Sequence, residues 1–356
     1  MAGATSSSKP ATIREVAALA GVSTATVSRA LRGEAGVEPA TRERVEVAAR
    51  ELRYRPSGVA RSLKLRSTRT LGLIVTDIEN PYFPQVIRAV EDAARARGYS
   101  VVLADGRRDP EREIQSLELL AAREVDGLLI ASSALTARHR SWIDERPCPV
   151  VVMNSPSVAE DVPSVASDNR AGGRLACEHL LALGHRRLAF LGTPALNNLS
   201  VDERLEGVRD AMSAAGLDPQ GLLLVDGDGG VEGGERAARS ALEARPEVTA
   251  LICYNDLTAV GALRGARALG RSVPADLSII GFDDIELAPY VDPPLTTVRQ
   301  DTDAMGDWAV RTLLASLGEI GGGGDEANTD AGTITKRIPV EIVERASAAA
   351  APDRAG

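Results

Sequence analysis

Two different spacings of apolar residues divide the chain. Between residues 12 and 52, apolar positions recur every three or four residues, which predicts short amphipathic helices. From residue 70 onward, short apolar runs such as "TLGLIVTD" and "DGLLIASS" alternate with longer helical patterns. This change predicts a small all-α head followed by a larger α/β body.

The spacing within the head predicts three helices. Thr12 and Glu15 form a capping box at the start of the first helix, and Gly21 follows its last apolar position. Ser23 can cap a second helix in "STATVSRAL", and Pro39 is suited to the start of a third. Three short helices with a tight turn between the first two are typical of a helix-turn-helix.

The second predicted helix presents a small polar face. Thr24, Ala25, Ser28 and Arg29 lie opposite its apolar side. A face of this kind fits the major groove of DNA, where Thr24 and Ala25 would meet base edges and the other two would reach bases or phosphates. A solvated helix on a small bundle gives the same pattern, so that alternative stays open.

The charge distribution favours nucleic acid as the partner of the head. The whole chain has a net charge of -9, but residues 1–68 have 12 Lys and Arg against 6 Asp and Glu, a net charge of +6. The remaining residues have 29 against 44, a net charge of -15. A basic head attracts a polyanion, while so acidic a body is repelled by it.

The body pattern predicts two doubly wound parallel sheets. Its strands are nearly continuous apolar runs, and helical patterns at 81–97, 110–123 and 169–183 separate them, as in sheets that are covered on both faces. Ligands of such sheets bind beyond the carboxyl ends of the strands. Polar residues gather at those ends, namely Asp77, Asn80, Asp105, Asn154, Asn255, Asp256, Asp283 and Asp284.

Three long segments carry a family resemblance. "TIREVAALAGVSTATVSRALRG", "TRERVEVAARELRYRPSGVARSL" and "GFDDIELAPYVDPPLTTVRQD" closely resemble the LacI/GalR family of bacterial transcriptional regulators, over about residues 12–345. The resemblance implies a periplasmic-binding-protein-like body that closes around a small molecule. It also implies a ligand-responsive repressor that acts as a homodimer on a roughly palindromic DNA operator.

The resemblance assigns the DNA contacts. Thr24 and Ala25 match the base-reading pair, and residues 56–64 match a hinge helix whose leucine, Leu63, kinks the centre of the operator. A flexible linker with incidental apolar residues is the alternative for this hinge. The full set expected at DNA is Thr12, Ser23, Thr24, Ala25, Thr26, Ser28, Arg29, Tyr54, Ala60 and Leu63.

The same resemblance assigns the effector pocket. The expected residues are Tyr82, Phe83, Asn154, Asp168, Arg204, Asn255, Phe282 and Asp283. A carboxylate such as Asp283 accepts from sugar hydroxyls, while Arg204 and Asn255 donate to them. Structural roles remain open for several, since Asp283 and Asn255 would also suit helix caps and the segment "NPYF" would suit packing at a helix start. The aromatic platforms of sugar-binding relatives are missing from "DGDGGVEGG" and from the position of Thr302, which leaves the identity of the sugar open.

Other function classes fit the chain poorly. It lacks the motifs of serine hydrolases, zinc proteases and P-loop enzymes, and its three histidines have neither triad nor metal-ligand spacing. The three cysteines form no CxxC pair. We therefore expect no catalytic residues, no metal and no cofactor. A secreted sugar-binding protein is disfavoured by the basic head and by an N-terminal segment without a signal-peptide pattern.

These patterns predict the organisation of the chain. We expect a disordered tail at 1–11, a helix-turn-helix domain at 12–55 and a hinge helix or linker at 56–68. A two-lobed effector-binding and dimerisation domain is expected at 69–346, and a second disordered tail at 347–356. The last segment shows no heptads, which argues against a tetramer built by a C-terminal coiled coil. We expect the protein in the cytoplasm, associated with the nucleoid.

Overall fold

The structure is a computed structural model that describes residues 11–31, 33–54, 67–131, 135–145, 148–155, 162–192, 199–318 and 335–352. The chain divides into two compact units, Met1–Thr68 and Arg69–Gly356. We call the first unit the head and the second the body. The expected hinge residues Ala60 and Leu63 lie outside the described residues.

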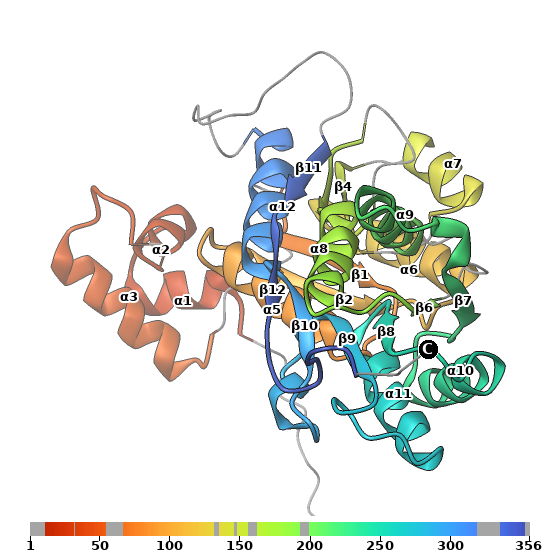
Figure 1. Cartoon of the computed structure of the whole chain (residues 1–356). Helices are drawn as coiled ribbons and strands as arrows, with labels where there is room; N and C mark the ends of the chain where they lie inside the picture. Colours follow the sequence, from red (N-terminus) through yellow and green to blue (C-terminus); the bar gives the residue numbers. More distant parts are fainter. Residues whose placement is uncertain are drawn as a thin grey trace, which may run out of the picture. The chain divides into compact units, whose positions relative to one another are not determined.

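The head contains the three expected helices, α1 (Ile13–Ala20), α2 (Thr24–Leu31) and α3 (Pro39–Glu51) (Figure 1). Their apolar faces meet in one core, which consists of Val16, Ala17, Ala20, Val27, Ala30, Val45, Ala48 and Ala49. Each of the three helices packs against the other two. The helical spacing of small and β-branched residues therefore produces a closed three-helix unit.

Local polar groups set the boundaries of α1 and α2. The Thr12 side chain and the Glu15 side chain form both halves of the expected capping box. Gly21 ends α1 with a φ of 68°, a left-handed conformation that glycine adopts without strain. Ser23 Oγ accepts from the Thr26 amide at 3.1 Å, which caps α2. The turn between the helices is thus determined by its own sequence.

The body contains two six-stranded sheets. We define the first lobe by the sheet of order β11-β5-β4-β3-β1-β2 and the second lobe by the sheet of order β12-β10-β9-β8-β6-β7. The strands of the first lobe are β1 (Thr70–Val75), β2 (Ser100–Asp105), β3 (Gly127–Ala131), β4 (Val150–Met153), β5 (Ser164–Ser167) and β11 (Thr335–Ile338). Those of the second lobe are β6 (Leu188–Gly192), β7 (Leu223–Asp226), β8 (Ala250–Cys253), β9 (Ser278–Asp283), β10 (Thr296–Gln300) and β12 (Val340–Val343).

Helices cover both faces of each sheet, as the apolar runs predict (Figure 1). In the first lobe, α5 (Tyr82–Arg95) packs with α12 (Thr302–Ser316), and α6 (Pro110–Ala122) packs with α7 (Ala137–Glu145). In the second lobe, α8 (Asn169–Ala182) packs with α9 (Leu199–Ala214), and α10 (Val231–Ala244) packs with α11 (Asp256–Ala268). The predicted pair of doubly wound sheets is confirmed.

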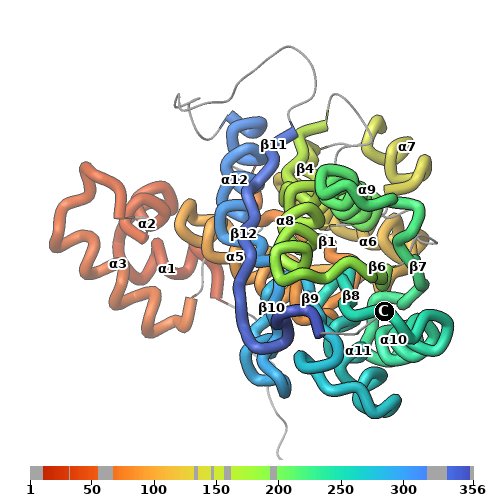
Figure 2. Tube along the Cα trace, in the orientation of Figure 1, coloured from red at the N-terminus to blue at the C-terminus, as the bar shows by residue number. Residues whose placement is uncertain are grey.

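One strand departs from the all-parallel expectation. β12 pairs with β10 antiparallel, whereas the other strand pairs of both sheets are parallel within the described residues. The chain passes directly from β11 in the first lobe to β12 in the second, so no helix reverses its direction (Figure 2). This short connection forces β12 to enter its sheet from the opposite end.

The chain crosses between the lobes three times, after β5, after β10 and between β11 and β12. The first and third crossings are joined, because the Asp168 amide donates to the Ile338 carbonyl at 2.8 Å. Residues that end β5 and β10 therefore lie at the boundary of the two lobes. This geometry allows both lobes to contribute side chains to one site.

The expectation of a disordered tail from residue 347 is wrong for residues 347–352. Ser347 is fully buried, and its hydroxyl donates to the Ile279 carbonyl at 2.6 Å. The Ala351 amide donates to the Leu183 carbonyl at 2.8 Å. Buried His185 contacts the Ala349 carbonyl through Nε2 at 3.0 Å. An alanine-rich segment that shows no periodicity is thus ordered by hydrogen bonds to the second lobe.

Candidate ligand cavity and nucleic-acid interface

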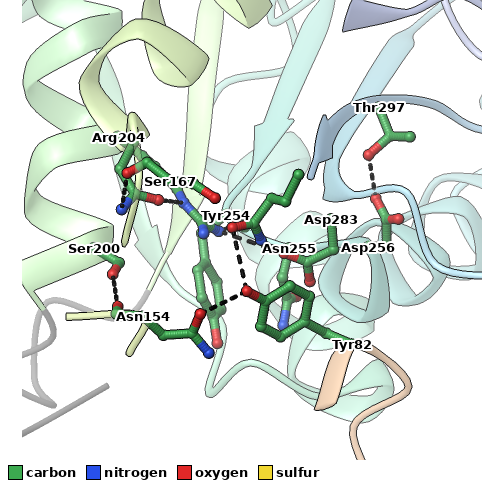
Figure 3. A network of polar contacts seen from close by, with 12 residues as sticks. Tyr82, Asn154, Ser167, Ser200, Arg204, Tyr254, Asn255, Asp256, Asp283 and Thr297 are labelled. Atoms are coloured by element: carbon green, nitrogen blue, oxygen red, sulfur yellow. Dashed lines mark hydrogen bonds and ion pairs between the residues drawn. The ribbon is translucent and has the colours of Figure 1, made fainter. Parts of the chain in front are cut away.

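A cavity of about 70 Å³ lies between the lobes, beyond the carboxyl ends of the strands. Most of its lining residues are polar, and both lobes supply them. They are Asn80, Tyr82, Phe83, Asn154, Ser167, Asn169, Ser200, Arg204, Tyr254, Asn255, Asp283 and Gln300. Figure 3 shows several of these side chains converging on one space.

The first-lobe wall is formed by the start of α5 and the end of β4. Asn80 Oδ1 accepts from the Tyr82 amide at 3.1 Å, which holds the backbone at the first residue of α5. Tyr82 then donates its hydroxyl to Asn154 Oδ1 at 2.7 Å (Figure 3). Asn154 has a left-handed φ of 63°, a conformation that asparagine tolerates.

Two polar atoms in the cavity wall are buried without a hydrogen-bond partner. They are Asn154 Nδ2 and Ser167 Oγ. Tyr82 occupies the oxygen of the Asn154 amide, which leaves its nitrogen as a donor toward the cavity. A buried polar atom without a partner costs about 1–3 kcal/mol, and a polar ligand would remove that cost.

Arg204 on α9 is the buried cation of the cavity. Its Nε donates to Asn169 Oδ1 at 2.9 Å, and its Nη1 donates to the Tyr254 carbonyl. The guanidinium carbon lies 3.5 Å from the centroid of the Phe282 ring. These contacts fix the guanidinium plane, because an arginine stacked on an aromatic face has little freedom to rotate.

Asp283 is the buried anion of the cavity, only 4% exposed. Gln300 Nε2 donates to Asp283 Oδ1 at 2.7 Å, and Arg204 Nη1 lies 3.9 Å from the same oxygen. Asp283 also has a φ of 123°, which is rare for a residue with a side chain. Burial raises the pKa of the Asp283 carboxyl, and the Arg204 charge opposes that rise.

The two acidic neighbours of Asp283 have structural roles. Asp256 accepts from Thr297 Oγ1 at 2.5 Å and from the Ile285 amide at 2.9 Å. Asp284 forms ion pairs with Arg299 at 2.7 Å and Arg345 at 2.6 Å. Of the adjacent pair, Asp283 faces the cavity and Asp284 holds the strands together.

Asn255 lines the cavity and also caps a helix, as the structural alternative predicted. Its Oδ1 accepts from the Thr258 amide at 2.8 Å, which caps α11, and its Nδ2 donates to the Gly229 carbonyl at 3.0 Å. Both ends of the amide are therefore used by the protein itself. Asn255 lines the cavity while its polar atoms mainly stabilise the loop and the helix start.

The structure brings together six of the eight side chains expected at the pocket, which are Tyr82, Phe83, Asn154, Arg204, Asn255 and Asp283. Phe282 instead lies beneath the Arg204 guanidinium. Asp168 is not among the lining residues, and its Oδ1 caps α8 by accepting from the Ala171 amide at 2.9 Å. The neighbouring Asn169 takes a place in the cavity that the sequence analysis did not anticipate.

Sequence reasoning also missed Ser167, Ser200 and Gln300. Ser200 donates to the Asn154 carbonyl at 2.9 Å and so connects the second lobe to the first (Figure 3). Ser167 and Gln300 end strands that the apolar pattern did not reveal. Once β5 and β10 are recognised as strands, the rule that ligands bind at carboxyl ends finds both residues.

The head presents the second candidate site. Thr24, Ala25 and Arg29 are exposed on α2. Several other residues expected at DNA have structural roles as well. Thr12 caps α1, the hydroxyls of Ser23 and Thr26 lie 2.9 Å apart, Tyr54 packs against the head core, and Ser28 is partly buried.

Two other classes of feature are missing from the part of the chain that the structure describes. No group of three or more His, Cys, Asp or Glu residues there is arranged to hold a metal ion. None of the helices described has the length and apolar character that crossing a membrane requires.

Two family descriptions match the chain. Residues 12–57 match "Bacterial regulatory proteins, lacI family", and residues 177–348 match "Periplasmic binding protein-like domain". The chain is 38% identical to the ribose operon repressor of Escherichia coli strain K12 over 305 residues, which are 85% of this chain and 92% of the relative.

Solved structures extend the similarity to the whole fold. The chain resembles a lac repressor dimer bound to operator and an anti-inducer, with a TM-score of 0.83, 30% identity and coverage of 96% of this chain and 100% of that one. It also resembles a LacI family regulator from Enterococcus faecium with bound ribose, with a TM-score of 0.68 and 30% identity. That match covers 79% of this chain and 99% of the other.

Proposed function

Because this chain belongs to the LacI family of bacterial regulatory proteins, we propose that it is a transcriptional repressor whose operator affinity is set by a small carbohydrate. The repressor binds a roughly palindromic operator as a homodimer and holds the carbohydrate between the lobes of the body. A protein that acts on chromosomal DNA works in the cytoplasm, at the nucleoid.

The head supports the DNA-binding part of the proposal. The exposed residues near the N-terminus of α2, Thr24 and Ala25, are small enough to let the helix enter the major groove closely. Arg29, one turn further, supplies a donor for base edges or phosphates. One such head reads only a few base pairs, so two heads on mirrored half-sites are needed for a specific operator.

The observation that best supports a carbohydrate effector is the pair of buried charges in the cavity. Arg204 Nη1 and Asp283 Oδ1 lie 3.9 Å apart, too far for a hydrogen bond between them. Adjacent hydroxyls of a sugar can accept from the guanidinium and donate to the carboxylate at the same time. Asn154 Nδ2 and Ser167 Oγ, which have no partner, offer further contacts to ring or hydroxyl oxygens.

The cavity size limits the ligand. A volume of about 70 Å³ has room for about five water molecules, which occupy about 150 Å³ as liquid. A single pentose or hexose is of this size class, and a disaccharide is larger. A relative is a ribose operon repressor and a similar structure holds ribose, so D-ribose is the first ligand to test.

The switch follows from linkage between the two sites. A sugar changes operator affinity only by the difference between its affinities for the DNA-binding and the released arrangements of the dimer, typically about 1–3 kcal/mol. We expect the sugar to act as an inducer that weakens operator binding. Residues 56–64, which follow the three head helices in sequence and precede the body, are the expected site of this coupling.

The Asp283→Ala variant tests the effector site. Removing the carboxylate deletes charge-assisted hydrogen bonds worth about 1.5–3 kcal/mol each, so we expect D-ribose affinity to fall at least about ten-fold. Operator binding should be unchanged, because the head is a separate unit. Isothermal titration calorimetry measures the first quantity and fluorescence anisotropy with labelled DNA the second.

A matched control is Asp292→Ala, which removes an aspartate of the second lobe that is 92% exposed. It should bind D-ribose like the wild type. Wild-type affinity in Asp283→Ala would contradict the proposed site, and conversion of the bound sugar into a product would contradict the assignment as a regulator.

A further inference from the structure

A chain of side-chain contacts leads out of the cavity from Arg204. Its Nε donates to Asn169 Oδ1 at 2.9 Å, and Asn169 Nδ2 donates to Glu203 Oε2 at 3.3 Å. Glu203 directly precedes Arg204 on α9, so the two neighbours hold opposite ends of the same amide. The position of Glu203 thereby determines where Asn169 presents its oxygen to the ligand-binding guanidinium.

Glu203 is in turn held from the other lobe. Arg337 on β11 donates to both carboxylate oxygens of Glu203, at 2.6 and 2.8 Å. Such a bidentate pair is the strongest geometry for an arginine and a carboxylate. Arg337 belongs to the first lobe and Glu203 to the second, so the pair spans the boundary between them.

The location of the pair suits a conformational role. Arg337 lies one residue before the third crossing, on β11, the edge strand of its sheet. Its Nη1 is also 3.4 Å from the carbonyl of Ser167, which lines the cavity and ends β5. The Glu203 side chain is 21% exposed and that of Arg337 is 37% exposed, so solvent screens the pair only in part.

We propose that Arg337 and Glu203 form an inter-lobe latch that favours the closed body and, through Asn169, positions Arg204 for the effector. Both are positioning residues, because neither lines the cavity. The assignment of Arg204 as an effector contact rests on the proposed function. The effect of the latch on the lobes does not depend on it.

The latch predicts a specific change in binding. If the lobes separate more easily, part of the free energy of sugar binding is used to close them, and the apparent dissociation constant rises by the inverse of the closed fraction. We expect the dissociation constant for D-ribose to rise about three- to ten-fold in Arg337→Met. The sugar should also dissociate faster, because lobes without the latch separate more easily around the bound sugar.

The matched control is another bidentate pair, which joins α8 to α9. Arg170 on α8 contacts both carboxylate oxygens of Asp210 on α9, at 2.6 and 3.1 Å. Both residues belong to the second lobe, so Arg170→Met removes a similar ion pair without releasing the boundary. It should leave the sugar affinity and the lobe distance unchanged.

The decisive experiment measures lobe separation in the full chain without ligand. Spin labels at Glu118→Cys on α6 and Glu243→Cys on α10, with Cys148→Ser, report the distance between the lobes by pulsed electron paramagnetic resonance. Compared with the wild type, Arg337→Met and Glu203→Gln should shift the distance distribution to larger values. Their double variant should shift it no further, since the same pair is lost in each case.

The outcomes separate the two proposals. Wild-type distance distributions in Arg337→Met and Glu203→Gln would overturn the latch, whatever the ligand. A shift in these two variants and none in Arg170→Met would support it. If the wild type bound neither D-ribose nor a specific operator, the proposed function would fail, and the spin-label distances would still decide whether the latch exists.

Discussion

Two buried residues, Arg204 and Asp283, determine the chemistry of the cavity. Transfer of an isolated charge out of water costs several kcal/mol, and neither residue forms a direct hydrogen bond with the other. Arg204 is compensated by the Phe282 ring and by Asn169, while Asp283 is compensated by Gln300. Each retains hydrogen-bonding capacity for a ligand that presents donors and acceptors close together.

The raised pKa of Asp283 predicts a pH dependence of stability. Its carboxyl binds a proton more tightly in the folded chain than in the unfolded one, because burial disfavours the charge. The stabilisation from the bound proton is complete below about pH 4, where the unfolded carboxyl titrates, and is lost as the pH rises through the folded pKa. Thermal unfolding from pH 4 to pH 8 measures this loss.

The comparison variant is Asp283→Asn, which cannot titrate at this position. Its unfolding temperature should fall less than that of the wild type over the same pH range. Asp256, whose pKa burial also raises, is present in both proteins, and its charge contributes to the raised pKa of Asp283. Parallel curves for the two proteins would contradict the assignment of a raised pKa to Asp283.

At the residue scale, some of the residues that line the cavity could be predicted from the sequence and others could not. Asn80, Asn154, Asn255 and Asp283 follow apolar runs, so the strand-end rule found them, whereas Tyr82 was expected only from the family resemblance. Asn169 and Gln300 were not predicted in this way, because neither follows a continuous apolar run. They line the cavity because the chain crosses between the lobes directly after β5 and after β10. The sequence does not reveal which of two adjacent polar residues caps a helix and which faces a ligand, as Asp168 and Asn169 illustrate.

At the scale of elements, α2 is the helix expected to read DNA. Substituting Thr24→Ala or Ala25→Ser changes what it presents to base edges without touching the head core. We expect a change in preference of about 1–3 kcal/mol at one or two positions of each half-site, and little change in non-specific affinity. Selection from a random DNA pool, followed by anisotropy titrations of the selected sites, measures both quantities.

Val47→Ala provides the control for α2, since Val47 is a half-exposed neutral residue on α3. Its selected sites should match those of the wild type. If the α2 variants also selected the same sites as the wild type, α2 would not be the reading helix.

The close packing of α9 against α8 determines the position of Arg204 in the cavity. A Cβ at Gly207 of α9 would lie 1.9 Å from the Arg170 carbonyl oxygen of α8, a contact that only backbone movement can relieve. Gly207→Ala should therefore lower the free energy of unfolding by about 1–3 kcal/mol and weaken D-ribose binding, as α9 moves away. Chemical denaturation and calorimetry measure the two effects.

Gly221→Ala is the matched control, because no atom lies within 4 Å of a Cβ built there. It should cost far less stability and leave sugar binding unchanged. Equal effects of the two substitutions would show that the helix contact does not constrain the cavity.

The sequence predicted elements with a periodic or continuous apolar pattern better than strands that mix polar and apolar residues. The head helices and eight strands of the body carry strong periodic or continuous apolar signals. β5, β10, β11 and β12 have four or five residues and include serine, threonine, arginine, lysine or glutamate, so their strand character depends on pairing with neighbours. The ordered tail at 347–352 was missed for the same reason, because its hydrogen bonds go to distant residues.

At the scale of the whole molecule, the charge distribution keeps the two functions apart. The basic head is attracted to DNA and the acidic body is repelled from it, which favours contact through the head alone. Each of the two units is compact in itself. A few kcal/mol of differential sugar affinity is enough to change operator occupancy.

The central claim is that a sugar between the lobes and an operator at the heads compete for the same dimer. The most direct test titrates the full-length protein with its selected operator, in the absence and in the presence of saturating D-ribose. We expect operator affinity to fall about 5- to 150-fold, and sugar affinity to fall by the same factor when the operator is saturating. An unchanged operator affinity in a protein that demonstrably binds the sugar would contradict the account.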